Sequence, residues 1–241
     1  MDKEKFSGKE FGGYGKKYHQ LKKHKLYSEL VVGEKVLDIG FAEVPNPFLK
    51  NPIGIDVQKI DRPKNYKDVY RVNMNKEKFP FADNCFDTAI AGEVVEHVEN
   101  PSFFLREINR TLKPNGKFIV STPHGCYYWE IIRNLFFSKI QSIDVGEHLS
   151  NWNILDFERL LNKNGFKVIK KYGSILVIRV PFGKGRIKIP VRRFPKLSWV
   201  VVYECVKEKK ADSRIYTRKK SNPKNVYYGA LTPEVIKIEN K

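Results

Sequence analysis

The sequence predicts an α/β protein with a doubly wound, mostly parallel sheet, and two observations support this fold class. Short apolar segments suited to buried strands alternate along the chain with longer segments of helical periodicity. In addition, the apolar segments 36–39 and 53–56 carry aspartates near their ends, Asp38 and Asp56. Ligands of open parallel sheets bind outside the carboxyl ends of the strands, where an acid can hydrogen-bond ribose hydroxyls. We therefore expect a nucleoside-containing ligand at this edge.

The N-terminal elements follow from the local pattern. Residues 1–30 are expected to form a flexible arm and then a helix over 18–30, which carries Leu21 and Tyr27. Short apolar segments, typical of buried parallel strands, follow the helix. The strands expected in this half of the chain are 36–39, 53–56, 69–72 and 88–91.

A second helix is expected to begin at Asn100 and Pro101, because proline is favoured in the first turn of a helix. Apolar residues at helical spacing follow it and predict a face that packs on the core. These residues are Phe103, Phe104, Ile108 and Leu112. The segment 113–116 (Lys-Pro-Asn-Gly) predicts a turn, and 118–121 predicts the fifth strand.

The C-terminal elements are a helix over 156–164, ended by Gly165, and strands that close the sheet. Segments 168–169 and 175–180, together with 200–205, are expected to add an antiparallel pair. Three further segments have compositions of their own. They are an aromatic insert over 124–150, with an expected helix over 127–137, a basic loop over 181–197, and a charged tail over 207–241.

The loop after the first strand argues against a dinucleotide ligand. A G-x-G-x-x-G loop lets backbone N–H groups approach a pyrophosphate. In the segment Gly40 to Pro45 only the first glycine is present, and Ala42 takes the place of the second. Glu43 adds negative charge, and Pro45 lacks an N–H donor. A ligand without phosphate fits this loop better.

Three linked motifs extend the pattern: Asn75 to Asp87, Gly92 to His97, and Leu112 to Lys117. In order and spacing they resemble the class I S-adenosylmethionine-dependent methyltransferases, over about residues 30 to 170. The resemblance implies a Rossmann-like sheet of seven strands, mostly parallel with an antiparallel last strand, in a domain over 31–206. It also implies S-adenosylmethionine as the cofactor.

The same resemblance assigns roles in cofactor binding. Asp38 and Gly40 would lie beside the methionine part of the cofactor, and Asp56 would hold the ribose hydroxyls. Asn75 stands where relatives often place an acid against the adenine amino group, and its side-chain oxygen can accept that hydrogen bond. The expected cofactor-binding residues are Asp38, Gly40, Ala42, Asp56, Val57, Asn75 and Glu93.

The motif Glu93-x-x-Glu96-His97 suggests either a metal site or a base. Its residues would share one face of a helix that began there, and His148 can return to the same edge. Carboxylates and imidazoles suit a divalent ion such as Mg²⁺ or Mn²⁺. The motif resembles that of metal-dependent O-methyltransferases acting on the 2'-hydroxyl of small RNAs and in the ubiquinone pathway. In the alternative without metal, His97 is the general base, and Glu93 and His148 are further catalytic candidates.

Three functions remain open at this stage. The first is O-methylation of a small molecule, a lipid-linked precursor or a glycan, and the second is methylation of RNA. The net charge of +18 and the basic stretches 16–25 and 184–196 would favour RNA, although lysine-rich surfaces also arise without such a partner. The third is a non-catalytic binding protein on the same scaffold, motivated by the depleted glycine loop.

Cysteine use and hydropathy predict a cytoplasmic protein. The chain has 3 cysteines without metal-like spacing, and no segment resembles a signal peptide. Its longest apolar stretches, such as 199–203, are far short of the roughly 20 residues that cross a bilayer. We therefore expect no transmembrane segment.

Overall fold

The computed structural model describes residues 13–59, 61–128, 131, 148–179 and 186–211. Its strands are β1 (Val36–Ile39), β2 (Ile53–Asp56), β3 (Asp68–Arg71), β4 (Phe86–Gly92), β5 (Leu112–Pro123), β6 (Phe166–Gly173), β7 (Ile175–Arg179), β8 (Arg186–Pro190) and β9 (Val200–Lys207). The helices are α1 (Gly13–Leu30), α2 (Pro101–Thr111) and α4 (Ile154–Lys163), with short 3₁₀ helices η1 (Val95–His97) and η2 (Pro195–Leu197).

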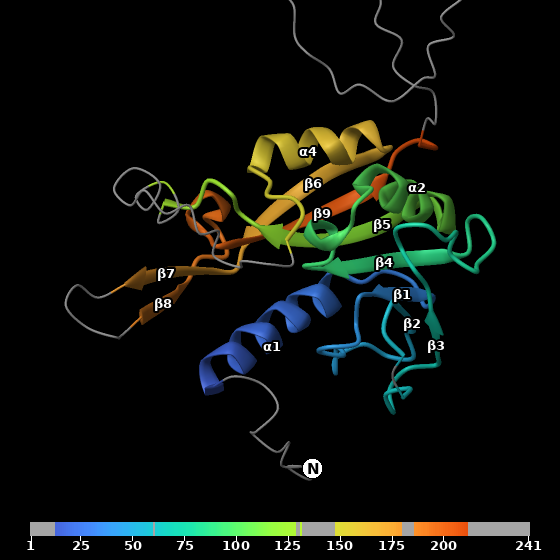
Figure 1. The fold of residues 1–241 in the computed structure, drawn as a ribbon, viewed down its shortest axis with the longest axis horizontal. Coiled ribbons are helices and arrows are strands. Elements are labelled where there is room, and N and C mark those ends of the chain that lie inside the picture. The colour runs from blue at the N-terminus through green and yellow to red at the C-terminus, as the bar shows by residue number, and fades with distance from the viewer. Residues whose placement is uncertain (1–12, 60, 129–130, 132–147, 180–185, 212–241) are drawn as a thin grey trace, which may run out of the picture. The chain divides into compact units, whose positions relative to one another are not determined.

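The main sheet has seven strands in the order β3-β2-β1-β4-β5-β9-β6. The strands from β3 to β5 run parallel, and β9 is antiparallel to both of its neighbours, β5 and β6. In Figure 1, α2 and α4 cover one face of this sheet and α1 lies against the other. The predicted fold class, a mostly parallel sheet closed by an antiparallel strand, is confirmed.

Successive side chains along the central strands point to opposite faces of the main sheet, so the core is divided between these two faces. Residues on one side of β1, β4 and β5 pack in a large cluster with the apolar faces of α2 and α4. Residues on the other side, such as Ile90 and Ile119, pack with Leu26 and Tyr27 of α1. This period of two is what a sheet buried on both faces requires. α1 is therefore part of the core of the domain.

Two helix boundaries follow the signals in the sequence. The Asn100 side chain accepts a hydrogen bond from the Phe103 N–H (3.0 Å), which caps α2. The side chains of Phe104, Leu105 and Ile108 are fully buried. α4 ends just before Gly165, whose φ of 85° lies in the left-handed region that glycine adopts at little cost. The glycine stop is confirmed, and the apolar stripe is confirmed for Phe104 and Ile108. Phe103 is only half-buried, and Leu112 is not on the helix but begins β5.

The prediction for segment 175–180 was wrong. β7 leaves the main sheet and pairs with β8 in a separate two-stranded sheet, so the predicted basic loop 181–197 also contains a strand. The chain departs at Gly173, where a side chain would meet the Val191 carbonyl oxygen at 2.5 Å. The Ser198 hydroxyl then accepts a hydrogen bond from the Ser174 N–H (2.7 Å), which holds the two ends of this excursion together. Such tertiary contacts have no local signal in the sequence.

The predicted turn at 113–116 lies inside β5. Leu112 pairs with Phe86, but the next pair is Lys117 with Thr88, so the intervening residues bulge out of the ladder. Asn115 has a φ of 61°, as a turn residue would. The turn chemistry was interpreted correctly, but the strand begins earlier than expected.

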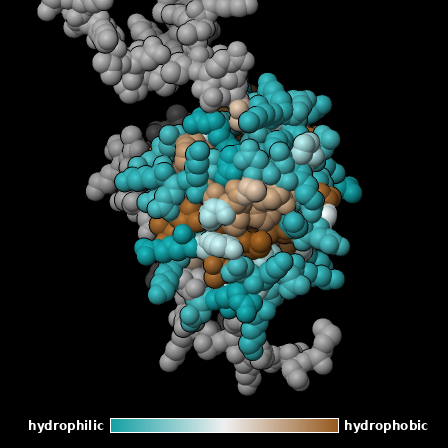
Figure 2. All heavy atoms as spheres, turned by 90° about the vertical axis from the view of Figure 1, so that its right-hand side faces the viewer, coloured by the Kyte–Doolittle hydropathy of each residue, from teal (hydrophilic) through white to brown (hydrophobic). Residues whose placement is uncertain are grey.

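Several predicted segments lie wholly or mostly outside the described residues: the N-terminal arm, the helix over 127–137 and the tail beyond 211. Of the described helices, none combines the length and apolar character that crossing a membrane requires. Figure 2 shows the side of the molecule on the right of Figure 1, which is largely hydrophilic around one apolar area near its centre.

Candidate active site

The ends of β1 and β2 bring Asp38, Gly40 and Asp56 together. Asp38 pairs in register with Gly54, and the Gly40 N–H donates to the Ile55 carbonyl oxygen (2.9 Å). Gly40 has a φ of 71°, and a side chain there would meet Val94 at 2.3 Å. The glycine is therefore required both by its backbone conformation and by its neighbour.

The Asp56 carboxylate organises the loops around it. Its two oxygens accept hydrogen bonds from the backbone N–H groups of Ala42 and Gln58, both at 2.9 Å. The side chain is 5% exposed, whereas that of the next residue, Val57, is 47% exposed. Asp56 thus ties the loop after β1 to the end of β2, and Val57 presents an apolar surface beside it.

Asp38 is buried and has a partner within the protein. The Tyr66 hydroxyl donates to its carboxylate (2.5 Å) and accepts from the Asn46 N–H (3.0 Å). Burial raises the pKa of Asp38 to about 7, an effect that the Tyr66 hydrogen bond opposes and the nearby Asp56 carboxylate adds to. Tyr66 was not anticipated from the sequence, because its partner is 28 residues away in the chain.

Asn75 lies after β3 and already uses its side-chain oxygen. That oxygen accepts a hydrogen bond from the Glu99 N–H (2.8 Å). The expectation that it is available for an adenine amino group therefore needs correction: only the second lone pair of the oxygen remains for a ligand.

Glu93 departs from the expected arrangement. It has a φ of 59° in the turn after β4, and the 3₁₀ helix begins only at Val95. The expectation that Glu93 shares a helix face with Glu96 and His97 is therefore wrong. Its carboxylate instead forms an ion pair with Lys23 of α1. Burial lowers the pKa of Lys23 to about 8, while the nearby Glu96 carboxylate acts in the opposite direction.

Glu96, His97 and His148 come together, as the sequence led us to expect. Each offers one ligand atom, and these atoms lie within 4.8 Å of one another. The rings of His97 and His148 meet edge to face, with centroids 4.6 Å apart. The backbone supports this contact, because the Leu149 N–H donates to the Glu96 carbonyl oxygen (2.8 Å).

The Glu96 carboxylate is unusual for its burial. The residue is 1% exposed, and neither carboxylate oxygen has a hydrogen-bond partner among the described residues. Burial raises the pKa of Glu96 to about 7, while the nearby Lys23 ammonium and the Thr122 hydroxyl act in the opposite direction. A buried acceptor without a donor is costly, and a cation or a donor from a ligand would relieve that cost.

α1 contributes more to the site than the sequence suggested. The Tyr27 hydroxyl hydrogen-bonds the Ser121 hydroxyl of β5 (2.7 Å), and the Tyr27 ring lies against Gly92 at the end of β4. Lys23 is one turn earlier on the same helix face. Lys23 is one of several lysines over 16–25, so the composition does not single it out. Its spacing from Leu26 and Tyr27 (i+3 and i+4) did indicate that it shares their helix face.

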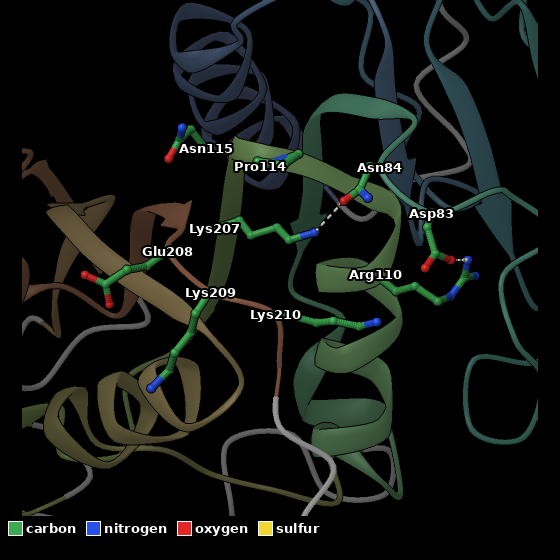
Figure 3. Close-up of a pocket in the computed structure, with 9 residues that line it drawn as sticks. All are labelled: Asp83, Asn84, Arg110, Pro114, Asn115, Lys207, Glu208, Lys209 and Lys210. Atoms are coloured by element: carbon green, nitrogen blue, oxygen red, sulfur yellow. Dashed lines mark hydrogen bonds and ion pairs between the residues drawn. The ribbon is translucent and has the colours of Figure 1, made fainter.

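A separate pocket of about 290 Å³ lies at the other end of the strands (Figure 3). It is lined by residues that precede β4, begin β5 or end β9, among them Asn84, Pro114 and Lys207. Because cofactors of parallel sheets bind at the carboxyl ends of the strands, this pocket is at the wrong edge for the predicted ligand.

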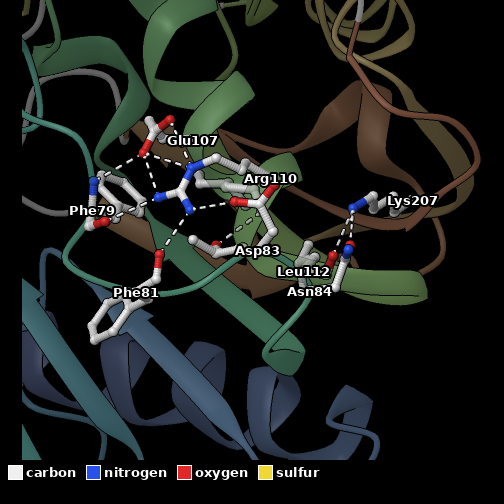
Figure 4. A network of polar contacts seen from close by, with 10 residues as sticks. Phe79, Phe81, Asp83, Asn84, Glu107, Arg110, Leu112 and Lys207 are labelled. Carbon is white, nitrogen blue, oxygen red and sulfur yellow. Dashed lines mark hydrogen bonds and ion pairs between the residues drawn. The ribbon is translucent and has the colours of Figure 1, made fainter.

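Two of the cations at this pocket, Arg110 and Lys207, form hydrogen bonds within the protein (Figure 4). The Arg110 guanidinium donates to the carbonyl oxygens of Phe79 (2.9 Å) and Phe81 (2.7 Å), and it also pairs with Asp83. Lys207 donates to the Leu112 carbonyl oxygen (2.7 Å). These bonds tie the loop before β4 to α2 and β9, which is a structural role.

The strand order and the acids at the ends of β1 and β2 define a Rossmann-like methyltransferase fold. Residues 47–120 match the family model described as a methyltransferase domain. This match and the fold support a class I S-adenosylmethionine-dependent methyltransferase.

Of the similar proteins, some are uncharacterized and others are named as methyltransferases. The chain is 28% identical over 185 residues to an uncharacterized protein of Methanocaldococcus jannaschii, covering 67% of this chain and 73% of that one. It is 27% identical over 163 residues to the mitochondrial ubiquinone biosynthesis O-methyltransferase of Rattus norvegicus, covering 59% of this chain but 47% of the rat protein. Thus the chain spans about half of that enzyme.

A solved structure extends the likeness of fold. A possible histamine N-methyltransferase of Thermotoga maritima superposes with a TM-score of 0.57 at 17% identity, covering 80% of this chain and 94% of that one. At this identity the likeness concerns the fold.

Proposed function

We propose that this methyltransferase transfers a methyl group from S-adenosylmethionine to a hydroxyl oxygen of a small molecule, a lipid-linked precursor or a glycan. The observation that carries the proposal is the group Glu96, His97 and His148, which lies just beyond β4 at the edge that also holds Asp38 and Asp56. A hydroxyl acceptor must lose a proton, and this group supplies basic side chains where the acceptor would meet the cofactor. The O-methyltransferase named among the relatives supports an oxygen acceptor.

The cofactor would be bound along the ends of β1 and β2. Asp56 and Val57 would contact the ribose and the adenine, and Asn75 would approach the adenine amino group. Asp38, beside Gly40 and Ala42, would face the positively charged methionine end. A cation there would lower the pKa of Asp38 from its raised value and favour the carboxylate.

Methyl transfer to a hydroxyl requires that the reacting atoms be aligned and that a group accept the hydroxyl proton. The sulfonium already activates the methyl group, so the protein chiefly aligns the acceptor oxygen, the methyl carbon and the sulfur. In the form without metal, an imidazole nitrogen of His97 would take the hydroxyl proton, and His148, in ring contact with His97, would orient it. Glu93 would act indirectly, by fixing α1 through Lys23.

In the metal-dependent form, Glu96, His97 and His148 would hold Mg²⁺ or Mn²⁺. These residues fit such an ion, because the Glu96 oxygens are buried without donors and the three ligand atoms are close together. The ion would orient the acceptor hydroxyl and make it more acidic. Glu93, expected in the same ligand set, is engaged by Lys23.

Calorimetry with S-adenosylmethionine and S-adenosylhomocysteine tests the proposal. The wild-type chain should bind both, and Asp56→Ala should weaken binding by about ten-fold or more, the scale of a hydrogen bond to a charged group. Asp61→Ala, which removes an exposed acid on the following loop, is the matched control and should bind as the wild type does. If neither compound binds at millimolar concentration, the enzyme proposal fails and a non-catalytic binding role replaces it.

A further inference from the structure

The β7–β8 hairpin has one face made of aliphatic side chains. In its register Leu176 is opposite Ile189, and Ile178 is opposite Ile187, so all four side chains lie on the same side of the two-stranded sheet. Ile178, Ile187 and Ile189 are 37%, 52% and 41% exposed. Such a concentration of exposed isoleucine on so small a sheet is typical of a binding surface.

The hairpin is held to the domain by its base and by one edge. Ile175, at its base, is buried. The Tyr127 and Tyr128 hydroxyls both donate to the Val177 carbonyl oxygen, at 2.6 and 2.7 Å. Beyond these contacts β7 and β8 extend away from the main sheet (Figure 1). Since an isolated two-stranded hairpin is marginally stable in water, these tyrosine bonds position a feature that the core does not support.

The segment that forms and flanks the hairpin carries charge of a single sign, although one of its cations, Arg192, pairs with Glu29 of α1. Between Glu158 and Glu204 the sequence contains no acidic residue. Arg193 and Lys196 are exposed just after β8. This surface is complementary to anions.

The hairpin leaves the sheet at the edge that carries the candidate active site. β6 ends at Gly173, and β9 begins at Val200, which pairs with Pro123 at the carboxyl end of β5. Whatever the hairpin binds is therefore brought to the same end of the strands as Asp38, Asp56 and the histidine pair.

We propose that the β7–β8 hairpin docks the protein on an anionic lipid bilayer, with its isoleucines in the membrane interface and the flanking cations against lipid phosphates. Peripheral proteins bind membranes through this combination of apolar side chains and basic residues. RNA is the less suitable partner, because RNA-binding surfaces stack bases on several aromatic side chains, whereas β7 and β8 present only aliphatic ones. The exposed aromatic side chain of the described segment 191–199 is that of Phe194 (62%), which can enter the membrane interface beside the isoleucines. That a docked enzyme would methylate an acceptor held in the bilayer rests on the function proposed above.

Sedimentation of the full chain with lipid vesicles tests this docking. The wild type should bind vesicles that contain phosphatidylglycerol and bind pure phosphatidylcholine vesicles weakly. Ile187→Asn with Ile189→Asn should weaken binding at least ten-fold, because the apolar contribution is lost. Neutralising Arg193 or Lys196 to glutamine should weaken it about five-fold each. Ile169→Asn, which changes an isoleucine that is 56% exposed on β6, is the matched control and should bind as the wild type does.

Three outcomes would overturn the docking proposal. The first is no binding to anionic vesicles. The second is binding that the isoleucine variants leave unchanged but that RNA competes away, which would assign the cations to RNA. The third is a dimer that the isoleucine variants dissociate, which would assign the hairpin face to a second copy. Calorimetry with S-adenosylmethionine on the same variants separates this test from that of the proposed function, because vesicle binding needs no cofactor.

Discussion

Replacing Asp38 with asparagine should change how the stability of the protein depends on pH. The pKa of Asp38 rises from 3.8 to about 7 in the folded protein, chiefly because the carboxyl is buried. The unfolded chain releases this proton near pH 4, so between pH 4 and 7 the folded protein binds more protons than the unfolded one. Under that condition the free energy of unfolding falls as pH rises. The neutral form is thus the stabilising one, and its benefit is lost as pH rises through 7.

The magnitude follows from the same pKa values. For this single group, the free energy of unfolding should fall by about 2.5 kcal/mol between pH 5 and pH 8. The asparagine variant stays neutral at both values, and its side-chain oxygen can still accept the hydrogen bond from the Tyr66 hydroxyl. The free energy of unfolding of Asp38→Asn minus that of the wild type should therefore be about 2.5 kcal/mol larger at pH 8 than at pH 5.

Urea denaturation of both proteins at pH 5 and pH 8 measures this difference, because the contributions of groups distant from Asp38 cancel. Asp61→Asn, at an exposed position, provides the control and should show no such difference. An Asp38→Asn effect of the same size at both pH values would refute the reasoning. The variant should also bind S-adenosylmethionine more weakly, if Asp38 faces the charged end of the cofactor as proposed.

Two further predictions concern the residues around η1. Lys23→Met should lower the free energy of unfolding by about 2 kcal/mol, because it leaves the partly buried Glu93 carboxylate without its partner. Adding Glu93→Gln should recover much of that loss in a urea-denaturation double-mutant cycle, and simple additivity would exclude the pairing. Millimolar Mn²⁺ should raise the melting temperature of the wild type and of Glu99→Gln but not of Glu96→Gln. An equal response in all three proteins, or none in the wild type, would count against the metal-dependent form.

The parallel half of the sheet and the ends of its strands could be predicted from the sequence, because their signals are local. Each buried strand is a short apolar run, and the acids that end β1 and β2 are adjacent to those runs. The capping asparagine of α2 and the glycine after α4 are equally local. The spacing of Glu96 and His97, with His148, also led to a group that the fold assembles.

What escaped prediction depends on contacts between distant residues. By sequence Lys23 resembles the many surface lysines, and only the docking of α1 makes it a half-buried partner of Glu93. Likewise, nothing near Tyr66 in the sequence indicates that its hydroxyl reaches Asp38. Segment 175–180 has the composition of a sheet strand, but β9 occupies the place beside β5 and β6. Which of two segments of similar composition joins the sheet depends on contacts throughout the chain and not on the local sequence.

The late position of β9 in the sequence has a consequence for biosynthesis. β9 comprises residues 200–207, and it fills the gap between β5 and β6. While a ribosome is still making the preceding residues, both of these strands would present open edges, which promote aggregation. Completion of the sheet must therefore wait until the ribosome has released residues 200–207 from its exit tunnel, and a nascent chain stalled before that point should depend on chaperones to remain dispersed.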